Sequence, residues 1–162
     1  MHTVPTVKDF MVREIKTLSP DMSMTDAMDF LSGNGISGAP VVKASGADCK
    51  LVGVLTEKDC LRVLVNNTFY GIRVDNSTVG EYMTSELVTI TPDKSLYYLA
   101  NILLTHVFRR IPVVDKNHNL VGLVSRRDVI KASKYLIADD DRKKVKEYLT
   151  EEMKARLSKT RF

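Results

Sequence analysis

Two stretches of the sequence share the pattern Gly-x-x-[Thr/Ser]-x-x-Asp: Gly53-Val54-Leu55-Thr56-Glu57-Lys58-Asp59 and Gly122-Leu123-Val124-Ser125-Arg126-Arg127-Asp128. In each, an apolar run leads to a Thr or Ser, and an acid follows three residues later. That spacing is typical of a capping box at the start of a helix. The same junction between strand and helix therefore occurs twice, which indicates an internal repeat that decides the architecture.

The repeat extends on the N-terminal side of both stretches. Three matches share an offset of about 72 residues: Met11 with Met83, Ser19-Pro20-Asp21 with Thr91-Pro92-Asp93, and Ala39-Pro40-Val41-Val42 with Ile111-Pro112-Val113-Val114. The opening pattern has an offset of about 69, so the first copy carries three extra residues, near Ala44–Lys50. We place this insertion in a turn, where loops tolerate length changes. Two copies of this length favour two small modules packed face to face.

Each copy predicts the order strand, helix, strand, strand, helix from its apolar periodicity and its turn residues. In the first copy these elements are Ile15–Leu18, Met24–Gly33, Ala39–Val42, Lys50–Val54 and Glu57–Val65. In the second they are Leu87–Ile90, Ser95–Leu104, Ile111–Val114, Leu120–Val124 and Ser125–Ser133. Gly33-Asn34-Gly35 is expected to end the first long helix.

The predicted fold is α/β (α+β), with two β-α-β-β-α modules packed sheet to sheet around a pseudo-two-fold axis and a C-terminal helix. Its divisions are a first motif over 7–66, a linker over 67–79, a second motif over 80–134 and a tail over 135–162. The tail places apolar groups at helical spacing from Val145 to Leu157. It predicts an amphipathic helix that packs on its own domain or its dimer mate, or docks on another protein.

Composition excludes several classes of protein. The 162 residues are 44% hydrophobic and 27% charged, as in ordinary globular domains. A net charge of +4 is compatible with an anionic ligand and too weak to indicate nucleic acid. We see no signal peptide and no apolar run of the length that a membrane span needs, so we expect a cytoplasmic protein. Cys49 and Cys60 have no metal or redox spacing.

The repeated pattern has two interpretations. In the first, the acid only completes the cap and needs no ligand. In the second, the helix N-terminus binds an anion, and Asp59 or Asp128 accepts hydrogen bonds from a vicinal diol such as ribose. Lys58, Arg126 and Arg127 are unfavourable beside a positive helix end unless an anion compensates them, which favours a phosphate ligand.

The repeated unit resembles a CBS domain. Its marks are the Ser/Thr-Pro-Asp after the first strand, the stretch Arg109-Arg110-Ile111-Pro112-Val113-Val114-Asp115 in the second copy, and the closing Asp pattern. The two copies together, over roughly Val7 to Ser133, resemble the tandem CBS pair, or Bateman module, of stand-alone CBS domain-containing proteins. The resemblance implies a non-catalytic regulatory module that binds AMP, ADP or ATP, and sometimes NAD or S-adenosylmethionine, in clefts between the motifs. It also implies a homodimer formed through CBS helices and a regulated protein partner.

The resemblance assigns binding residues to two clefts. The first would combine Thr56, Lys58, Asp59, Leu87, Val88, Arg109, Arg110, Ile111 and Pro112. The second would combine Ser125, Arg127, Asp128, Ile15, Lys16, Ser37, Gly38, Ala39 and Pro40. Asp would hold the ribose, the strand segments would sandwich the adenine, and Lys and Arg would face phosphates. Because Ser37-Gly38 stands where the second copy has Arg109-Arg110, the clefts are unequal and one can stay empty; the Arg pair favours the first.

No catalytic or metal-binding constellation is expected. The three histidines, His2, His106 and His118, belong to no cluster with metal-ligand spacing. No nucleophile-elbow, kinase or hydrolase pattern is present. Besides a nucleotide sensor, the sequence leaves open a structural or protein-interaction CBS dimer with empty clefts, in which the repeated motifs are caps only.

Overall fold

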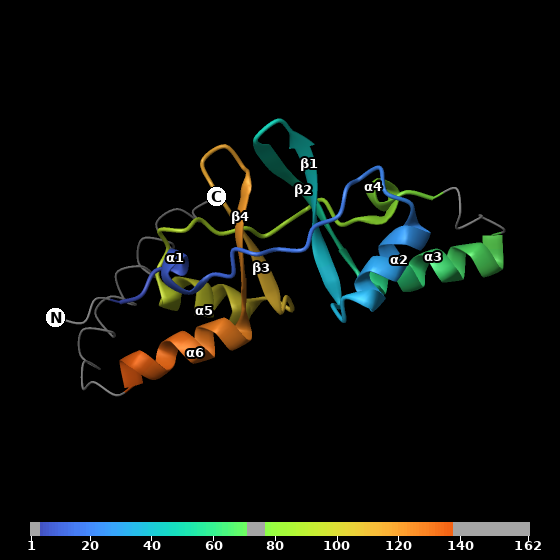
Figure 1. Ribbon diagram of the computed structural model, residues 1–162. Helices are drawn as coiled ribbons and strands as arrows, with labels where there is room; N and C mark the ends of the chain where they lie inside the picture. The colour runs from blue at the N-terminus through green and yellow to red at the C-terminus, as the bar shows by residue number, and fades with distance from the viewer. Residues whose placement is uncertain (1–3, 71–76, 138–162) are drawn as a thin grey trace, which may run out of the picture. The chain divides into compact units, whose positions relative to one another are not determined.

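The computed structural model describes residues 4–70 and 77–137 (Figure 1). They form two compact units, each drawing on separate parts of the chain. The first, here called the α2–α3 unit, holds residues 14–70, 77–89 and 114–121. The second, the α5–α6 unit, holds residues 4–13, 90–113 and 122–137. The predicted tail helix lies outside the described residues.

The first repeat forms a helix, a hairpin and a second helix, as predicted. These are α2 (Met24–Gly33), β1 (Gly38–Ser45), β2 (Asp48–Thr56) and α3 (Glu57–Tyr70). The bounds of α2 are the predicted ones. Ser23 accepts a hydrogen bond from the Asp26 amide at its start, and Gly35, with φ +60°, follows its last turn. A residue in this left-handed conformation just beyond a helix is a frequent stop signal, and glycine adopts it without strain.

The three-residue insertion of the first copy lengthens the strands instead of the turn, so our placement of it was wrong. β1 and β2 pair in antiparallel register as far as Ser45 and Asp48, with Gly46 in the turn at φ +62°. Residues 43–50 are all exposed. The inserted residues extend the ladder because a two-residue turn closes it, and the hairpin becomes longer than its counterpart in the second repeat.

The second repeat has the same order of elements. It comprises α5 (Leu96–Thr105), β3 (Arg110–Val114), β4 (Leu120–Ser125) and α6 (Arg126–Ile137). Ser95 accepts a hydrogen bond from the Tyr98 amide at the start of α5. α5 and α6 lie side by side in the α5–α6 unit, as α2 and α3 do in the other unit (Figure 1).

The predicted outer strands Ile15–Leu18 and Leu87–Ile90 shrink to single parallel bridges. Leu18 pairs with Val41, and Ile90 pairs with Val113. The other residues of the two segments pair with no strand, so each predicted strand is reduced to one bridged residue.

Two four-residue helices, α1 (Val7–Phe10) and α4 (Val79–Tyr82), were not predicted. Each precedes one repeat and packs on the other. The Val7 amide donates to the Lys94 carbonyl at 2.8 Å, and the Val79 amide donates to the Met22 carbonyl at 2.9 Å. Each short helix is therefore part of the compact unit that the other repeat builds: α1 belongs to the α5–α6 unit and α4 to the α2–α3 unit. We call this arrangement the exchange of leading helices.

The second residue after each short helix continues this exchange. Thr84 forms an antiparallel bridge with Val54 of β2, and Val12 forms the equivalent bridge with Leu123 of β4. Each hairpin therefore gains a neighbour on both edges, one from its own repeat and one from the segment that leads the other.

Apolar side chains from helix and sheet fill each unit. The core of the α2–α3 unit consists of Leu18, Met24, Ala27, Leu31, Ala39, Val41, Leu55, Cys60, Val63 and Val79. In the α5–α6 unit the buried apolar residues include Val7, Leu96, Leu99, Ile102, Leu103, Ile111, Val113, Val124 and Ala132. The leading helix contributes a fully buried valine to both cores, Val79 in one and Val7 in the other. Among residues 4–70 and 77–137 no helix has the length and apolar character needed to cross a membrane.

Candidate functional site

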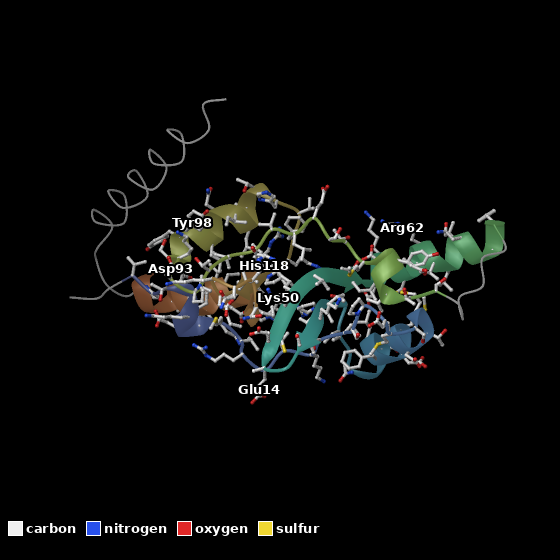
Figure 2. All side chains as sticks on the ribbon, turned by 90° about the horizontal axis from the view of Figure 1, so that it is seen from above. Glu14, Lys50, Arg62, Asp93, Tyr98 and His118 are labelled. Carbon is white, nitrogen blue, oxygen red and sulfur yellow. The ribbon has the colours of Figure 1, made fainter. Side chains whose placement is uncertain are left out.

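The first repeated motif forms a capping box where β2 runs into α3. The Thr56 amide and its Oγ1 hydroxyl donate to Asp59 Oδ2 at 2.9 and 2.7 Å. Asp59 is only 3% exposed, and its Oδ1 lies 3.4 Å from a guanidinium nitrogen of Arg62. Both oxygens of this carboxylate therefore have partners within the chain, and Arg62 extends from the exposed side of α3 (Figure 2).

The second motif forms the same box where β4 runs into α6, with one difference. The Ser125 amide and its Oγ donate to Asp128 Oδ2 at 2.8 and 2.6 Å. Asp128 is half-buried, and Oδ1 has no partner among the described residues. A carboxylate has several lone-pair sites, so this Asp can cap the helix and still accept a hydroxyl.

Each capping box lies beside the segment that precedes the proline of its own repeat. In the first repeat Gly38 pairs with Thr56, and the Glu57 amide donates to the Ser37 carbonyl at 3.1 Å. In the second, the Arg126 amide donates to the Arg109 carbonyl at 3.2 Å. Strand pairing thus fixes the helix start and the pre-proline backbone against each other within each repeat. The predicted pairing of these segments across the repeats stays a prediction.

The predicted binding residues divide between the units. The α2–α3 unit holds Ile15, Lys16, Ser37, Gly38, Ala39, Pro40, Thr56, Lys58, Asp59, Leu87 and Val88. The α5–α6 unit holds Arg109, Arg110, Ile111, Pro112, Ser125, Arg127 and Asp128. The side chains directly before the two prolines are core residues, since Ile111 is fully buried and Ala39 is 2% exposed. A ligand can use the backbone of these positions more readily than their side chains.

The cations differ in their availability. Lys58, Arg109, Arg110 and Arg127 are exposed, and none has an ion-pair or side-chain hydrogen-bond partner in the described part of the chain. Lys16 instead donates to Asn34 Oδ1. The three cations assigned to the first cleft are therefore unpaired among the described residues. Of the two assigned to the second cleft, Lys16 already has a partner and Arg127 has none there.

Arg126 has a structural explanation that the sequence did not reveal. Its guanidinium donates to the carbonyls of Leu103 and His106, at 3.1 and 3.2 Å, where α5 ends. Cations are favourable at the negative end of a helix, so this arginine needs no phosphate to account for its position. The electrostatic argument for an anion now depends on the remaining cations.

A cleft of about 410 Å³ lies within the α5–α6 unit, against α1 and α6. Its lining is Pro5, Asp9, Phe10, Asp128, Lys131 and Ala132. The Asp9 pKa lies below its ordinary value, first because Thr6 donates side-chain and backbone hydrogen bonds to the carboxylate. Two carboxylates against one lysine disfavour a phosphate here, so this cleft fits a neutral or cationic group better.

Apart from Asp128, the residues lining this cleft were not among the predicted site residues. Thr6-x-x-Asp9 is itself a capping-box pattern and could have revealed α1. Within 4–70 and 77–137, no group of three or more His, Cys, Asp or Glu side chains could hold an ion.

The fold and its paired motifs define a tandem repeat of two small α+β modules, each with an Asp-capped helix start. The chain belongs to the CBS domain family, which it matches over residues 7–66 and 79–135.

Two curated relatives differ greatly in length. The chain is 33% identical over 123 residues to the CBS domain-containing protein YhcV of Bacillus subtilis, covering 76% of this chain and 81% of YhcV. It is also 33% identical over 133 residues to an inosine-5'-monophosphate dehydrogenase of Nitrosopumilus maritimus. That match covers 82% of this chain and only 25% of the dehydrogenase.

Solved structures with the same fold carry ligands. The crystal structure of CBSX2 in complex with AMP has a TM-score of 0.70 and 30% identity, covering 82% of this chain and 98% of that one. CBSX2 is a CBS-pair protein from Arabidopsis thaliana. The CBS domain pair of MJ0100, solved with 5-methylthioadenosine and S-adenosyl-L-methionine, has a TM-score of 0.65 and 26% identity, covering 80% and 95%.

Proposed function

We propose that this chain is a non-catalytic regulatory module that binds an adenosine-containing ligand of the AMP, ADP or ATP class. Ligand occupancy would be passed to a second copy of the chain or to a partner protein. A ligand can do this only by binding two states of the protein with different affinity. NAD and S-adenosylmethionine also contain adenosine and are included in the proposal as further ligands.

The proposed site uses residues from both repeats, as the family resemblance implies. Asp59 or Asp128 would accept the ribose hydroxyls, and the pre-proline backbone would border the adenine. Arg109, Arg110 and Lys58 would face the phosphates of the first cleft, and Lys16 and Arg127 those of the second. Arginine suits this role because its planar fork can donate two parallel hydrogen bonds to one phosphate.

One observation carries the proposal: cations without partners surround the positive ends of two helices. Lys58 and Arg127 lie in the first turns of α3 and α6, and the Arg109 backbone is bonded to the start of α6. Positive side chains at such positions lower stability unless an anion neutralises them. A nucleotide phosphate supplies that anion, and the AMP complex of CBSX2 supports the ligand class.

The first cleft is the better candidate for a phosphorylated ligand. Its three cations are free within the described residues, whereas Lys16 of the second cleft is bonded to Asn34. The second cleft has the carboxylate with the free oxygen, that of Asp128. We therefore propose that phosphate charge decides the site more than the ribose contact does, so that a nucleotide prefers the first cleft and prefers it more with each added phosphate.

A thermal-shift panel tests this function, with AMP, ADP, ATP, NAD and S-adenosylmethionine added to wild type, Asp59→Ala and Asp128→Ala. A ligand at 100 times its Kd adds about 2.7 kcal/mol to stability. That corresponds to a rise in Tm of several degrees. If no adenosine compound moves the wild-type Tm, the proposal fails. If both Asp variants lose stability yet keep the full shift, the motifs are caps only.

The second candidate function is a protein-interaction dimer with empty clefts. It is supported by the exposed apolar residues of α3, since Leu61, Leu64, Val65 and Phe69 are 61%, 49%, 51% and 76% exposed. It is also supported by the completeness of the capping boxes, which need no ligand. The ligand panel separates the two candidates, because an interaction module gives no shift with any nucleotide.

A further inference from the structure

The segment between α5 and β3 leads directly into Arg109 and Arg110. Its side chains are poorly anchored, since Val107 is 90% exposed and Phe108 is 39% exposed, and Leu104 in the last turn of α5 is 84% exposed as well. The ring of His106 stacks on Phe108 with centroids 5.6 Å apart. With so little burial, the side chains of this segment cannot by themselves hold its backbone in place.

Arg126 holds this backbone at three points. Its guanidinium donates to the Leu103 and His106 carbonyls at 3.1 and 3.2 Å, and its amide donates to the Arg109 carbonyl at 3.2 Å. The bonds run from the last turn of α5 to the residue before β3. A planar guanidinium fixes the geometry of the carbonyls it binds, because its donors are rigidly arranged.

The first repeat provides an internal comparison. Glu57 occupies the position of Arg126 and makes only the backbone bond, to Ser37 at 3.1 Å. There α2 is ended by its own residues: Asn34 Nδ2 donates to the Phe30 carbonyl at 2.7 Å, and Gly35 takes the left-handed conformation. The second repeat has His106 and Val107 in these positions: His106 caps α5 through its amide and Nδ1, 3.1 and 3.0 Å from the Ile102 carbonyl, and Val107 does not take the left-handed conformation. Arg126 therefore adds two side-chain hydrogen bonds to the end of α5, and Glu57 makes no counterpart of them at the end of α2 among the described residues.

We infer that Arg126 is a positioning residue that presents Arg109 and Arg110 to the phosphate of the nucleotide. The inference rests on the proposed function and deepens it. Arg126 does not bind phosphate itself, since its guanidinium is bonded to carbonyls. It fixes the backbone from which the two exposed guanidiniums project, so less ordering remains to be done when the phosphate binds.

The test separates phosphate recognition from adenosine recognition. Isothermal titration gives Kd for adenosine and for AMP with wild type, Arg126→Ala and Arg126→Lys. The ratio of the two constants measures the gain due to phosphate. We expect Arg126→Ala to reduce that ratio roughly three- to tenfold, as the loss of preorganisation for one or two side chains predicts. Arg126→Lys keeps the charge without the fork and should restore only part of it.

Two further measurements distinguish positioning from a general structural role. In an Arg109→Ala/Arg110→Ala background, Arg126→Ala should no longer change the ratio. Glu57→Ala, the matched change in the first repeat, should leave the ratio at its wild-type value. If Arg126→Ala lowers Tm or weakens both ligands equally, with the ratio unchanged, the inference is overturned and the proposed function stands. If wild type binds neither compound, the inference is overturned, and if no other ligand of the thermal-shift panel binds either, the proposed function is overturned with it.

Discussion

The side chain of Met83 occupies the space that a β-carbon on Gly53 would need. Its Cγ would lie only 2.8 Å from such a carbon. Met11 has the same relation to Gly122, with its Cγ at 3.0 Å. The glycine that opens each repeated motif is thus required because the methionine after each leading helix packs against the other repeat's hairpin.

Gly53→Ala should therefore lower the free energy of unfolding by about 1–3 kcal/mol, the usual cost of overpacking a filled site. Urea denaturation of the purified protein measures it. Adding Met83→Ala should recover part of the loss, because the overlap is removed. Gly33→Ala is the control, since a β-carbon there meets nothing within 4 Å. A loss at Gly33 as large as that at Gly53 would contradict the steric explanation.

His118→Gly should stabilise the protein. His118 has φ +65° in the turn between β3 and β4, a left-handed conformation that costs a side-chain-bearing residue about 1–2 kcal/mol. Glycine adds roughly 0.5–1 kcal/mol of entropy to the unfolded chain, so a net gain of about 0.5–1 kcal/mol is expected.

The turn's packing is kept in this variant, because the Leu51 amide donates to the backbone carbonyl of His118. His118 and the neighbouring Lys50 are marked in Figure 2. Asn117→Gly, at a position without positive φ, serves as the control and should lower stability in the same urea titration.

The ionised carboxylate of Asp9 should stabilise the folded protein, and this contribution should be lost at acidic pH. Its folded pKa is lowered from an ordinary value of 3.8, first through the Thr6 side-chain hydrogen bond. Its contribution is therefore complete above 3.8 and is lost as the pH falls below that value, through the folded pKa. Asp9→Asn should flatten the decline of Tm between about pH 4 and pH 2.

Asp21→Asn provides the control for this measurement, because Asp21 is exposed and its carboxylate makes no hydrogen bond among the described residues. That variant should follow the wild-type curve in acid. An Asp9→Asn curve parallel to wild type down to pH 2 would show that α1 docks without help from this carboxylate.

The exposed stripe of α3 should mediate the dimer if one forms through CBS helices. Leu61, Val65 and Phe69 recur at four-residue spacing and share one face. Phe69→Glu should weaken self-association roughly tenfold or more, as loss of an apolar anchor does. Sedimentation of wild type and variant measures it, with Leu104→Glu as a control outside α3. Equal behaviour of both variants would exclude this face.

Local signals in the sequence were enough to predict most of the fold. α2 was predicted to the residue because Ser23 and Gly35 mark its two ends. α1 and α4 were missed because four residues cannot show a helical period, although Thr6 with Asp9 and Thr78 with Glu81 form capping boxes. The insertion lies near Ala44–Lys50 as predicted, but its assignment to a turn was wrong because turn and strand residues look alike in an exposed hairpin.

The site was less predictable than the fold. The carboxylates and free cations follow from the repeated motif, since the motif also fixes the helix starts. The role of Arg126 could not be predicted, because its acceptors are backbone carbonyls some 20 residues earlier in the chain. Backbone acceptors occur at every residue, so no pattern of side chains marks the ones that an arginine will find.

The exchange of leading helices also sets the order in which the chain can fold as it leaves the ribosome. α1 is made early, yet the backbone carbonyls of Pro92 and Lys94, which receive its amides, are made roughly 80 residues later. At about 5–20 residues per second, that is a wait of several seconds. α4, by contrast, emerges after the carbonyls of Pro20 and Met22 that it binds. α1 therefore docks after α4, although it is made first of the two, and the α5–α6 unit closes only once the second repeat has been made.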